Sequence, residues 1–142
     1  MPPGRSPHRR LHNRTGRAGE ELARRTLEER GYRILASNWR ARDERRGEID
    51  LVALEGGDLV FIEVKTRRSA AYGSAAEAIT PAKTRRLLAL AQAYIARVYS
   101  TEAGGDAGSP EPPWRVDVVT IEFDQAGQPR VEIIRDAIEA WA

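Results

Sequence analysis

Three carboxylates and one lysine stand at the outer ends of a predicted β-hairpin. Glu48 and Asp50 precede one apolar run, and Glu63 and Lys65 end the next. The dipeptide Gly56-Gly57 between the runs is typical of a tight hairpin turn. Symmetric closure about this turn places Asp50 opposite Glu63. It also places Glu48 opposite Lys65, with paired Cβ atoms roughly 4.5–5.5 Å apart.

This arrangement indicates a metal site. Like charges directly opposite destabilise an antiparallel pair, so a purely structural sheet should avoid setting Asp50 against Glu63. A divalent cation removes that objection, and carboxylates are the hard oxygen donors that suit Mg²⁺ or Mn²⁺. We therefore predict that Asp50, Glu63 and Glu48 bind the metal. The structural alternative is a solvated sheet edge in which Glu48 and Lys65 form an ordinary cross-strand ion pair.

The predicted chemistry is hydrolysis of a phosphodiester. A divalent ion can polarise a phosphoryl oxygen and generate hydroxide near neutral pH. Lys65 could position the attacking water or stabilise the charge that builds on phosphorus. In an earlier predicted helix, Glu20 shares the core-facing side with Ala23 and Leu27, which adds a fourth candidate carboxylate. The alternative for Glu20 is a favourable interaction with the helix dipole.

Arginines crowd beside the acidic cluster. The net charge of +2 says little about partners, but the arginine positions say more. Arginine grips phosphate bidentately, so these residues predict contact with a nucleic acid, whereas codon bias is the alternative explanation. A lysine in the first turn of a later helix could also reach a phosphate, or be simply solvated. The candidate nucleic-acid contacts are Arg40, Arg42, Arg45, Arg46, Arg67 and Lys83.

Composition excludes several classes of protein. The 142 residues suit one domain, and the absence of cysteine excludes disulfides and thiolate metal sites. No run of about 18 apolar residues indicates a membrane span, and the N-terminus lacks the apolar core of a signal peptide. We expect a soluble, cytoplasmic protein with no membrane partner. A P-loop, a dinucleotide glycine fingerprint and a Ser/His/Asp arrangement are all absent.

Periodicity and breakers predict a single α/β domain at residues 15–142 after a disordered basic tail at 1–14. The predicted helices span 19–30 and 80–99, with Thr80 as cap and Pro81 at the first helical position. The predicted strands span 32–39, the two hairpin arms, 116–123 and 131–134. A flexible connector is expected at about 100–113, and one or two helical turns at 136–141. The order α-β-β-β-α-β-β predicts a mixed sheet flanked by helices. Asp117, inside an apolar strand, is assigned a structural role, exposed or paired with Arg115.

The chain resembles the YraN family of small bacterial proteins over about residues 14–135. The matching blocks are Gly16-x-x-Gly19-Glu20, Gly31-Tyr32, Asn38-Trp39-Arg40, Gly47-Glu48-Ile49-Asp50-Leu51, Phe61-Ile62-Glu63-Val64-Lys65-Thr66-Arg67, Tyr72-Gly73 and Lys83. That family in turn resembles the PD-(D/E)XK nuclease superfamily, particularly the archaeal Holliday-junction resolvases. The resemblance implies a restriction-endonuclease-like fold.

The resemblance also implies residue roles. In the superfamily an Asp, a Glu and a Lys bind Mg²⁺ and perform hydrolysis, and a helical Glu often completes the site. These roles fall on Asp50, Glu63, Lys65 and Glu20. The superfamily's proline before the Asp is absent, and Ile49 stands there. The resolvases work as dimers, so the resemblance also implies a homodimer.

Two functions from different classes follow. The first is a Mg²⁺- or Mn²⁺-dependent endonuclease-like protein that hydrolyses DNA, including branched DNA. The alternative is a nucleic-acid-binding or scaffold protein on a nuclease fold with weak or no catalysis. A third, less favoured, is an accessory factor that binds RNA or the ribosome. The set Asp50, Glu63 and Lys65 favours the enzyme, because a pure binder has no use for opposed carboxylates.

Overall fold

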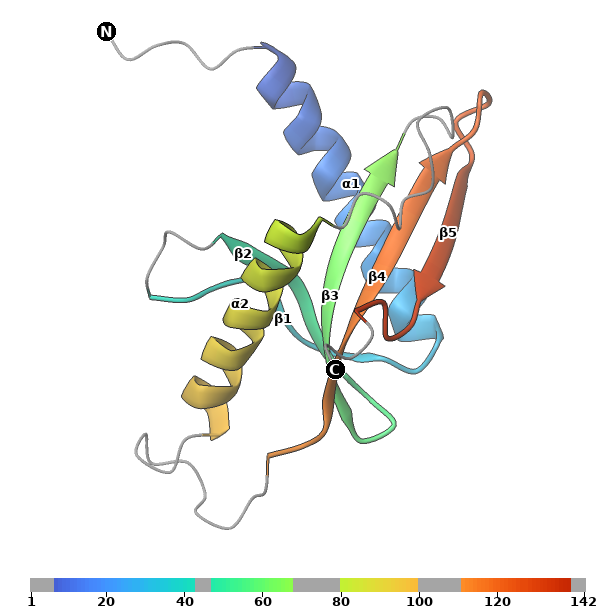
Figure 1. Cartoon of the computed structure of the whole chain (residues 1–142). Helices are drawn as coiled ribbons and strands as arrows, with labels where there is room; N and C mark the ends of the chain where they lie inside the picture. Colours follow the sequence, from blue (N-terminus) through green and yellow to red (C-terminus); the bar gives the residue numbers. More distant parts are fainter. Residues whose placement is uncertain (1–6, 43–46, 68–79, 100–110, 139–142) are drawn as a thin grey trace, which may run out of the picture.

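The computed structural model describes residues 7–42, 47–67, 80–99 and 111–138 (Figure 1). The helices are α1 (Pro7–Glu29) and α2 (Pro81–Tyr99). The strands are β1 (Arg33–Arg40), β2 (Glu48–Glu55), β3 (Asp58–Arg67), β4 (Trp114–Phe123) and β5 (Pro129–Ile134). This is the predicted order α-β-β-β-α-β-β, and the architecture is that of a restriction-endonuclease-like α/β domain.

The N-terminal segment differs from the prediction. Helix α1 begins at Pro7, so residues 7–14 are helical, whereas the sequence predicted a disordered tail over 1–14. Proline is favoured at a first helical position, and the arginines and leucine that follow have high helix propensity. Residues 1–6 lie outside the described part of the chain, as does 100–110 of the predicted connector. Residues 135–138 form a turn and a bend instead of the predicted helical start, and 139–142 are not described.

The five strands form one sheet in the order β1-β2-β3-β4-β5. Only β3 and β4 run parallel, and the other neighbours are antiparallel. Parallel neighbours need a crossover, and α2 supplies it. Helix α2 covers the front of the sheet in Figure 1 and α1 covers the back.

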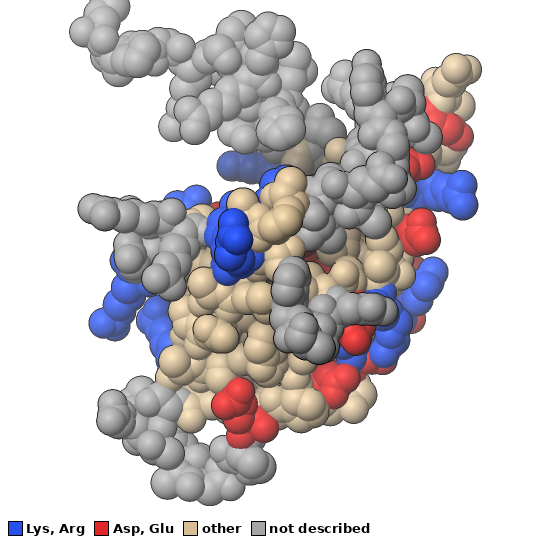
Figure 2. Space-filling view, in the orientation of Figure 1, with Lys and Arg blue, Asp and Glu red and all other residues tan. Residues whose placement is uncertain are grey.

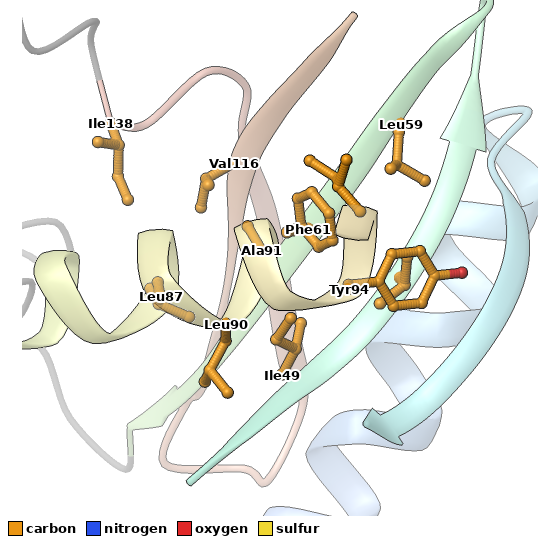
Figure 3. Packing of buried hydrophobic residues seen from close by; sticks show 11 residues of the cluster. Ile49, Leu59, Phe61, Leu87, Leu90, Ala91, Tyr94, Val116 and Ile138 are labelled. Carbon is orange, nitrogen blue, oxygen red and sulfur yellow. The ribbon is translucent and has the colours of Figure 1, made fainter. Parts of the chain in front are cut away.

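Each helix covers its own hydrophobic core. On the α2 side, Leu87, Leu90 and Tyr94 pack against Ile49 and Phe61 (Figure 3). On the α1 side, the buried residues are Ala23, Leu27, Tyr32, Leu51, Ala53, Val60, Ile62, Val119 and Ile121. At the start of α2 the backbone N–H of Lys83 donates to Thr80 Oγ1 at 3.2 Å, which confirms the predicted cap. Both helices are thus anchored on the strands that carry the candidate site.

A buried polar network lies at the turn end of the hairpin. The fully buried Asp117 accepts from Tyr32 Oη at 2.8 Å and from Arg115 Nε at 3.0 Å. Arg115 also pairs with Glu55 at 2.8 Å and with Asp58 at 2.6 Å. The structural role predicted for Asp117, paired with Arg115, is confirmed.

Neither helix is both long and apolar enough to span a membrane, as judged over the described ranges.

Candidate functional site

The hairpin has the predicted register only near its turn. Leu54 pairs with Leu59 and Val52 with Phe61, as symmetric closure requires. Over the described residues, however, the β2–β3 ladder ends at the pair Leu51–Ile62. The prediction that Asp50 pairs with Glu63, and Glu48 with Lys65, is therefore wrong as a statement of strand pairing.

The sheet forks beyond this point. Strand β2 stays paired with β1 as far as Glu48, while β3 stays paired with β4 as far as Arg67. The two halves of the sheet thus diverge at the level of Asp50 and Glu63. We call the region between the diverging strands, lined by Glu20, Glu48, Asp50, Glu63 and Lys65, the fork.

An irregularity in β1 and β2 accompanies the fork. Asn38, which falls opposite Asp50 between the pairs Ser37–Leu51 and Trp39–Ile49, has a φ of +51°. Asparagine is one of the few residues that tolerates this left-handed conformation.

Strict alternation also fails in β2. Ile49 packs on the α2 side together with Val52, whereas Leu51 packs on the α1 side. Residues two apart in a regular strand share a face, so the strand must rotate at Asp50. A symmetric-hairpin argument cannot predict such a rotation.

Asp50 is tied to the neighbouring strand by its side chain. Its Oδ2 accepts from the backbone N–H of Val64 at 2.8 Å. Burial, followed by the charge of Glu63, raises the pKa of Asp50 from the ordinary 3.8 to about 7; the Val64 hydrogen bond opposes this rise, and Glu20 and Glu48 add to it. The Asp50 carboxylate therefore lies in a field of like charge.

Three of the predicted acidic residues converge. Glu20, Glu48 and Asp50 each bring one carboxylate oxygen to within 4.8 Å of the others. Burial raises the pKa of Glu20 and the charge of Glu48 adds to the rise, whereas the Asn38 side chain and the charge of Arg17 oppose it. We call these three residues the acidic cluster. The predicted ligand Glu63 is not one of them, whereas Glu20, predicted as a catalytic residue, is.

Close docking of α1 positions Glu20. A Cβ atom added to Gly19 would overlap Thr66 Oγ1 on β3 and would also contact Ile121. Glycine lets the helix backbone approach the strand that closely, and Glu20 follows it directly. This gives the Gly19-Glu20 pair of the N-terminal block a physical reason.

Glu63 faces basic side chains. It is 6% exposed, and its Oε1 lies 3.4 Å from Lys65 Nζ and 3.9 Å from Arg86 Nη2. The pKa of Lys83 is lowered, first by the adjacent Lys65 amine and then by burial, so these two amines lie side by side. We call Lys65, Lys83 and Arg86 the basic cluster.

The ion pair expected of a plain sheet edge is not formed. Glu48 pairs with Arg40, Oε2 to Nε at 3.0 Å, and Lys65 pairs with Glu63 instead. Among the other predicted nucleic-acid contacts, Arg42 is exposed and Lys83 is half-buried. Arg45, Arg46 and the side chain of Arg67 lie outside the described residues.

Two residues that contact the side chains lining the fork were not predicted as site residues. Asn38 contacts Glu20 and has a strained backbone, and Arg86 reaches Glu63 from α2. Asparagine inside a strand-like segment is a signal for Asn38, because that residue is depleted from strands and tolerates a positive φ. No signal in the sequence distinguishes Arg86 from its neighbour Arg85.

Comparison with known proteins places these features in a family. Residues 19–121 match the model of the uncharacterised protein family UPF0102, which is the YraN family that the sequence resembles. A UPF0102 protein of Symbiobacterium thermophilum is 47% identical over 130 residues, which cover 92% of this chain and 100% of the relative. One from Arthrobacter sp. is 49% identical, covering 84% and 92%, and one from Roseiflexus castenholzii is 46% identical, covering 89% and 94%.

Proposed function

We propose that this chain, which belongs to the uncharacterised protein family UPF0102, is a divalent-metal-dependent enzyme that hydrolyses DNA phosphodiesters. The observation that carries the proposal is the convergence of Glu20, Glu48 and Asp50 beside Glu63 and Lys65. Acidic and basic groups thus meet at one point of the sheet, where a phosphate and a cation could be held together.

The acidic cluster fits a divalent cation. Its three carboxylates are hard oxygen donors of the kind that Mg²⁺ and Mn²⁺ prefer. Asp50 and Glu20 take part in no ion pair within the described chain, although the charge of Arg17 acts on Glu20, so the repulsion between them is only partly offset by the protein. Glu20, Glu48 and Asp50 would hold the ion, with Glu63 close enough to raise the pKa of Asp50. An ion bound there would polarise a phosphoryl oxygen and lower the pKa of a water molecule.

The other residues have roles that follow from their positions. The Val64 N–H fixes one oxygen of Asp50, so the carboxylate is oriented before any ligand arrives. Lys65, held 3.4 Å from Glu63, presents an ammonium that can stabilise charge developing on the phosphoryl oxygens. The Asn38 side chain lies close enough to Glu20 to lower the pKa of that carboxyl, and so to favour its charged form.

DNA is the proposed substrate because the fork is bordered by arginine and lysine. Arg40 pairs with Glu48 at its mouth, Arg42 is exposed nearby in sequence, and Lys83 adjoins Lys65. Basic side chains on both sides of a carboxylate cluster are suited to a polyanion whose backbone must approach it. Branched DNA, which the resolvase resemblance indicates, is the first structure to test.

A nuclease assay tests the proposal. Purified protein with Mg²⁺ or Mn²⁺ is incubated with duplex, flap, single-stranded and four-way DNA. Asp50→Ala and Glu20→Gln should abolish cleavage, whereas Glu21→Gln, one residue along α1 on its exposed face, should cleave like the wild type. Wild-type protein that binds these DNAs without cleaving any would instead support the scaffold function.

A further inference from the structure

Arg86 enters the fork from the second turn of α2. Its Nη2 lies 3.9 Å from Glu63 Oε1. On its other side a Cβ atom added to Gly47 would lie 3.2 Å from Nη1 and 3.7 Å from Cδ. Gly47 has a φ of +81°, so a side chain there would be strained and would also displace the guanidinium. The glycine that opens the Gly47–Leu51 block therefore makes room for Arg86.

Arg86 is not held as a structural arginine is. A guanidinium has five N–H donors, and buried donors are normally paired. Within the described chain the buried Nε of Arg86 has no hydrogen-bond partner. The 3.9 Å between Arg86 Nη2 and Glu63 Oε1 exceeds the length of a hydrogen bond. Arg115, by contrast, donates to Asp58, Asp117 and Glu55.

Charge on this side of the fork favours an anion. Lys65, Lys83 and Arg86 gather around the single carboxylate of Glu63. Lys83 and Arg86 are three residues apart and so share one face of α2 near its N-terminus, where the helix dipole is positive. Figure 2 shows basic side chains over the first turns of this helix.

We propose that Arg86, supported by Gly47 and Glu63, is a phosphate-binding residue of this site and holds a phosphodiester oxygen together with Lys83. The inference rests on the proposed function. Arg86 would offset the repulsion between the acidic cluster and the DNA backbone. Arginine suits this role because its planar guanidinium can donate two parallel hydrogen bonds to one phosphate.

A matched pair of α2 variants tests the assignment. Arg86→Gln and Arg85→Gln remove the same charge from adjacent positions, and Arg85 is exposed. Affinity for a fluorescent DNA duplex is measured by anisotropy with Ca²⁺ replacing Mg²⁺ to slow hydrolysis. Arg86→Gln should weaken binding about 10-fold, which corresponds to about 1.4 kcal/mol, while Arg85→Gln changes it less than about 2-fold. Arg86→Lys should bind at an intermediate strength because it retains the charge but lacks the planar guanidinium.

Nuclear magnetic resonance supplies a second readout that needs no variant to fold. The Nε–H signal of Arg86 in the wild type should shift on addition of the duplex, since a phosphate bound by the exposed part of the guanidinium changes the environment of that proton. The Arg85 signal should shift much less. An unmoved Arg86 signal in protein saturated with DNA, or equal losses of affinity in Arg86→Gln and Arg85→Gln, would overturn the assignment.

The outcomes separate this inference from the proposed function. If the wild type cleaves DNA and Arg86→Gln binds it with unchanged affinity, Arg86 is not a phosphate-binding residue and the proposed nuclease activity stands. If affinity depends on Arg86 and its Nε–H signal shifts, but no DNA is cleaved, the phosphate contact stands and the proposed nuclease activity is rejected. If the wild type binds no DNA, both the phosphate contact and the proposed nuclease activity are rejected.

Discussion

The Asp50 carboxylate accepts a hydrogen bond from the backbone N–H of Val64, with Oδ2 2.8 Å from the nitrogen. Backbone pairing between β2 and β3 has already ended at Leu51 and Ile62. A side chain therefore ties the strands together just where the backbones separate. The same carboxylate belongs to the acidic cluster, so a structural contact and a candidate metal ligand share one residue.

Asp50→Asn should stabilise the metal-free protein and alter its pH dependence. The folded-state pKa of about 7 lies above the ordinary 3.8, so the folded state holds this proton more tightly. The free energy of unfolding should consequently fall as pH rises from about 4 to about 7, then level off. The asparagine variant lacks this loss, and should be more stable than the wild type at pH 8 by roughly 1–3 kcal/mol.

Urea unfolding in EDTA between pH 4 and pH 8 measures this difference. The gap between Asp50→Asn and wild type should widen up to about pH 7, whereas Glu21→Gln should follow the wild-type profile. Adding Mg²⁺ should stabilise the wild type but not Asp50→Asn. Parallel wild-type and Asp50→Asn profiles would contradict the assigned environment.

At the opposite end of the hairpin, the repulsion between two opposed carboxylates is relieved by an arginine. Glu55 and Asp58 are directly paired across the turn, and Arg115 bridges them. Opposed carboxylates therefore do not by themselves indicate a metal. The fork is distinguished by the lack of any ion pair to Asp50 or Glu20 within the described residues.

Arg115→Met should destabilise the fold without a specific effect on the site. Among the described residues, its loss leaves the fully buried Asp117 with only the Tyr32 hydroxyl and the Asp136 N–H as partners. Breaking a buried pair from one side costs about 3–5 kcal/mol. Thermal and urea unfolding should show this loss, while any Mg²⁺ affinity persists in the remaining folded protein. A change under about 1 kcal/mol would show that the network contributes little to stability.

Local signals in the sequence predicted most of the fold. The glycine pair set the hairpin register, and Thr80-Pro81 set the start of α2, because both depend on short-range geometry. The fork was not predictable in this way. It depends on a positive φ at Asn38 and a rotation at Asp50, which involve strand β1 and helix α1 as well as the hairpin.

The candidate site was predicted in its residue types but not in its grouping. Alternation placed Glu48 and Asp50 on one face, and helical periodicity placed Glu20 toward the sheet. The three carboxylates do converge, although the rotation at Asp50 breaks the strict alternation from which the first placement was inferred. Glu63 was assigned to the same group because the hairpin was assumed to stay paired, whereas the diverging strands set it beside Lys65 and Arg86.

Gly19→Ala should disturb the site through the docking of α1. The added methyl group meets Thr66 on β3, so the helix must shift or Thr66 must change rotamer. We expect a loss of about 1–3 kcal/mol in stability and weaker Mg²⁺ binding through displacement of Glu20. Gly16→Ala, in the same helix with nothing within 4 Å, should instead stabilise the protein by about 0.5–1 kcal/mol. Urea unfolding and calorimetric titration with Mg²⁺ compare them, and equal behaviour would contradict close docking at Gly19.

Asn38→Gly separates backbone strain from the contact between the Asn38 side chain and Glu20. Glycine adopts the φ of +51° without steric cost, so the fold should persist. The side-chain contact to Glu20 is lost, and Mg²⁺ affinity should fall several-fold, as when an outer-shell partner of a metal ligand is removed. Asn38→Ala should lose the same affinity and also about 1 kcal/mol of stability, because alanine is strained in this conformation. An unchanged Mg²⁺ titration for Asn38→Gly would exclude a positioning role.

Lys65→Ala distinguishes an enzyme from a binding protein. The ammonium lies 3.4 Å from Glu63 and beside Lys83, so it is placed to act on a phosphate held in the fork. An interaction that is stronger in the transition state lowers turnover more than affinity. Lys65→Ala should therefore abolish cleavage while DNA affinity with Ca²⁺ falls only a few-fold. Cleavage at the wild-type rate would remove the catalytic role, whereas parallel loss of binding and cleavage would make Lys65 a ground-state phosphate contact and favour the scaffold function.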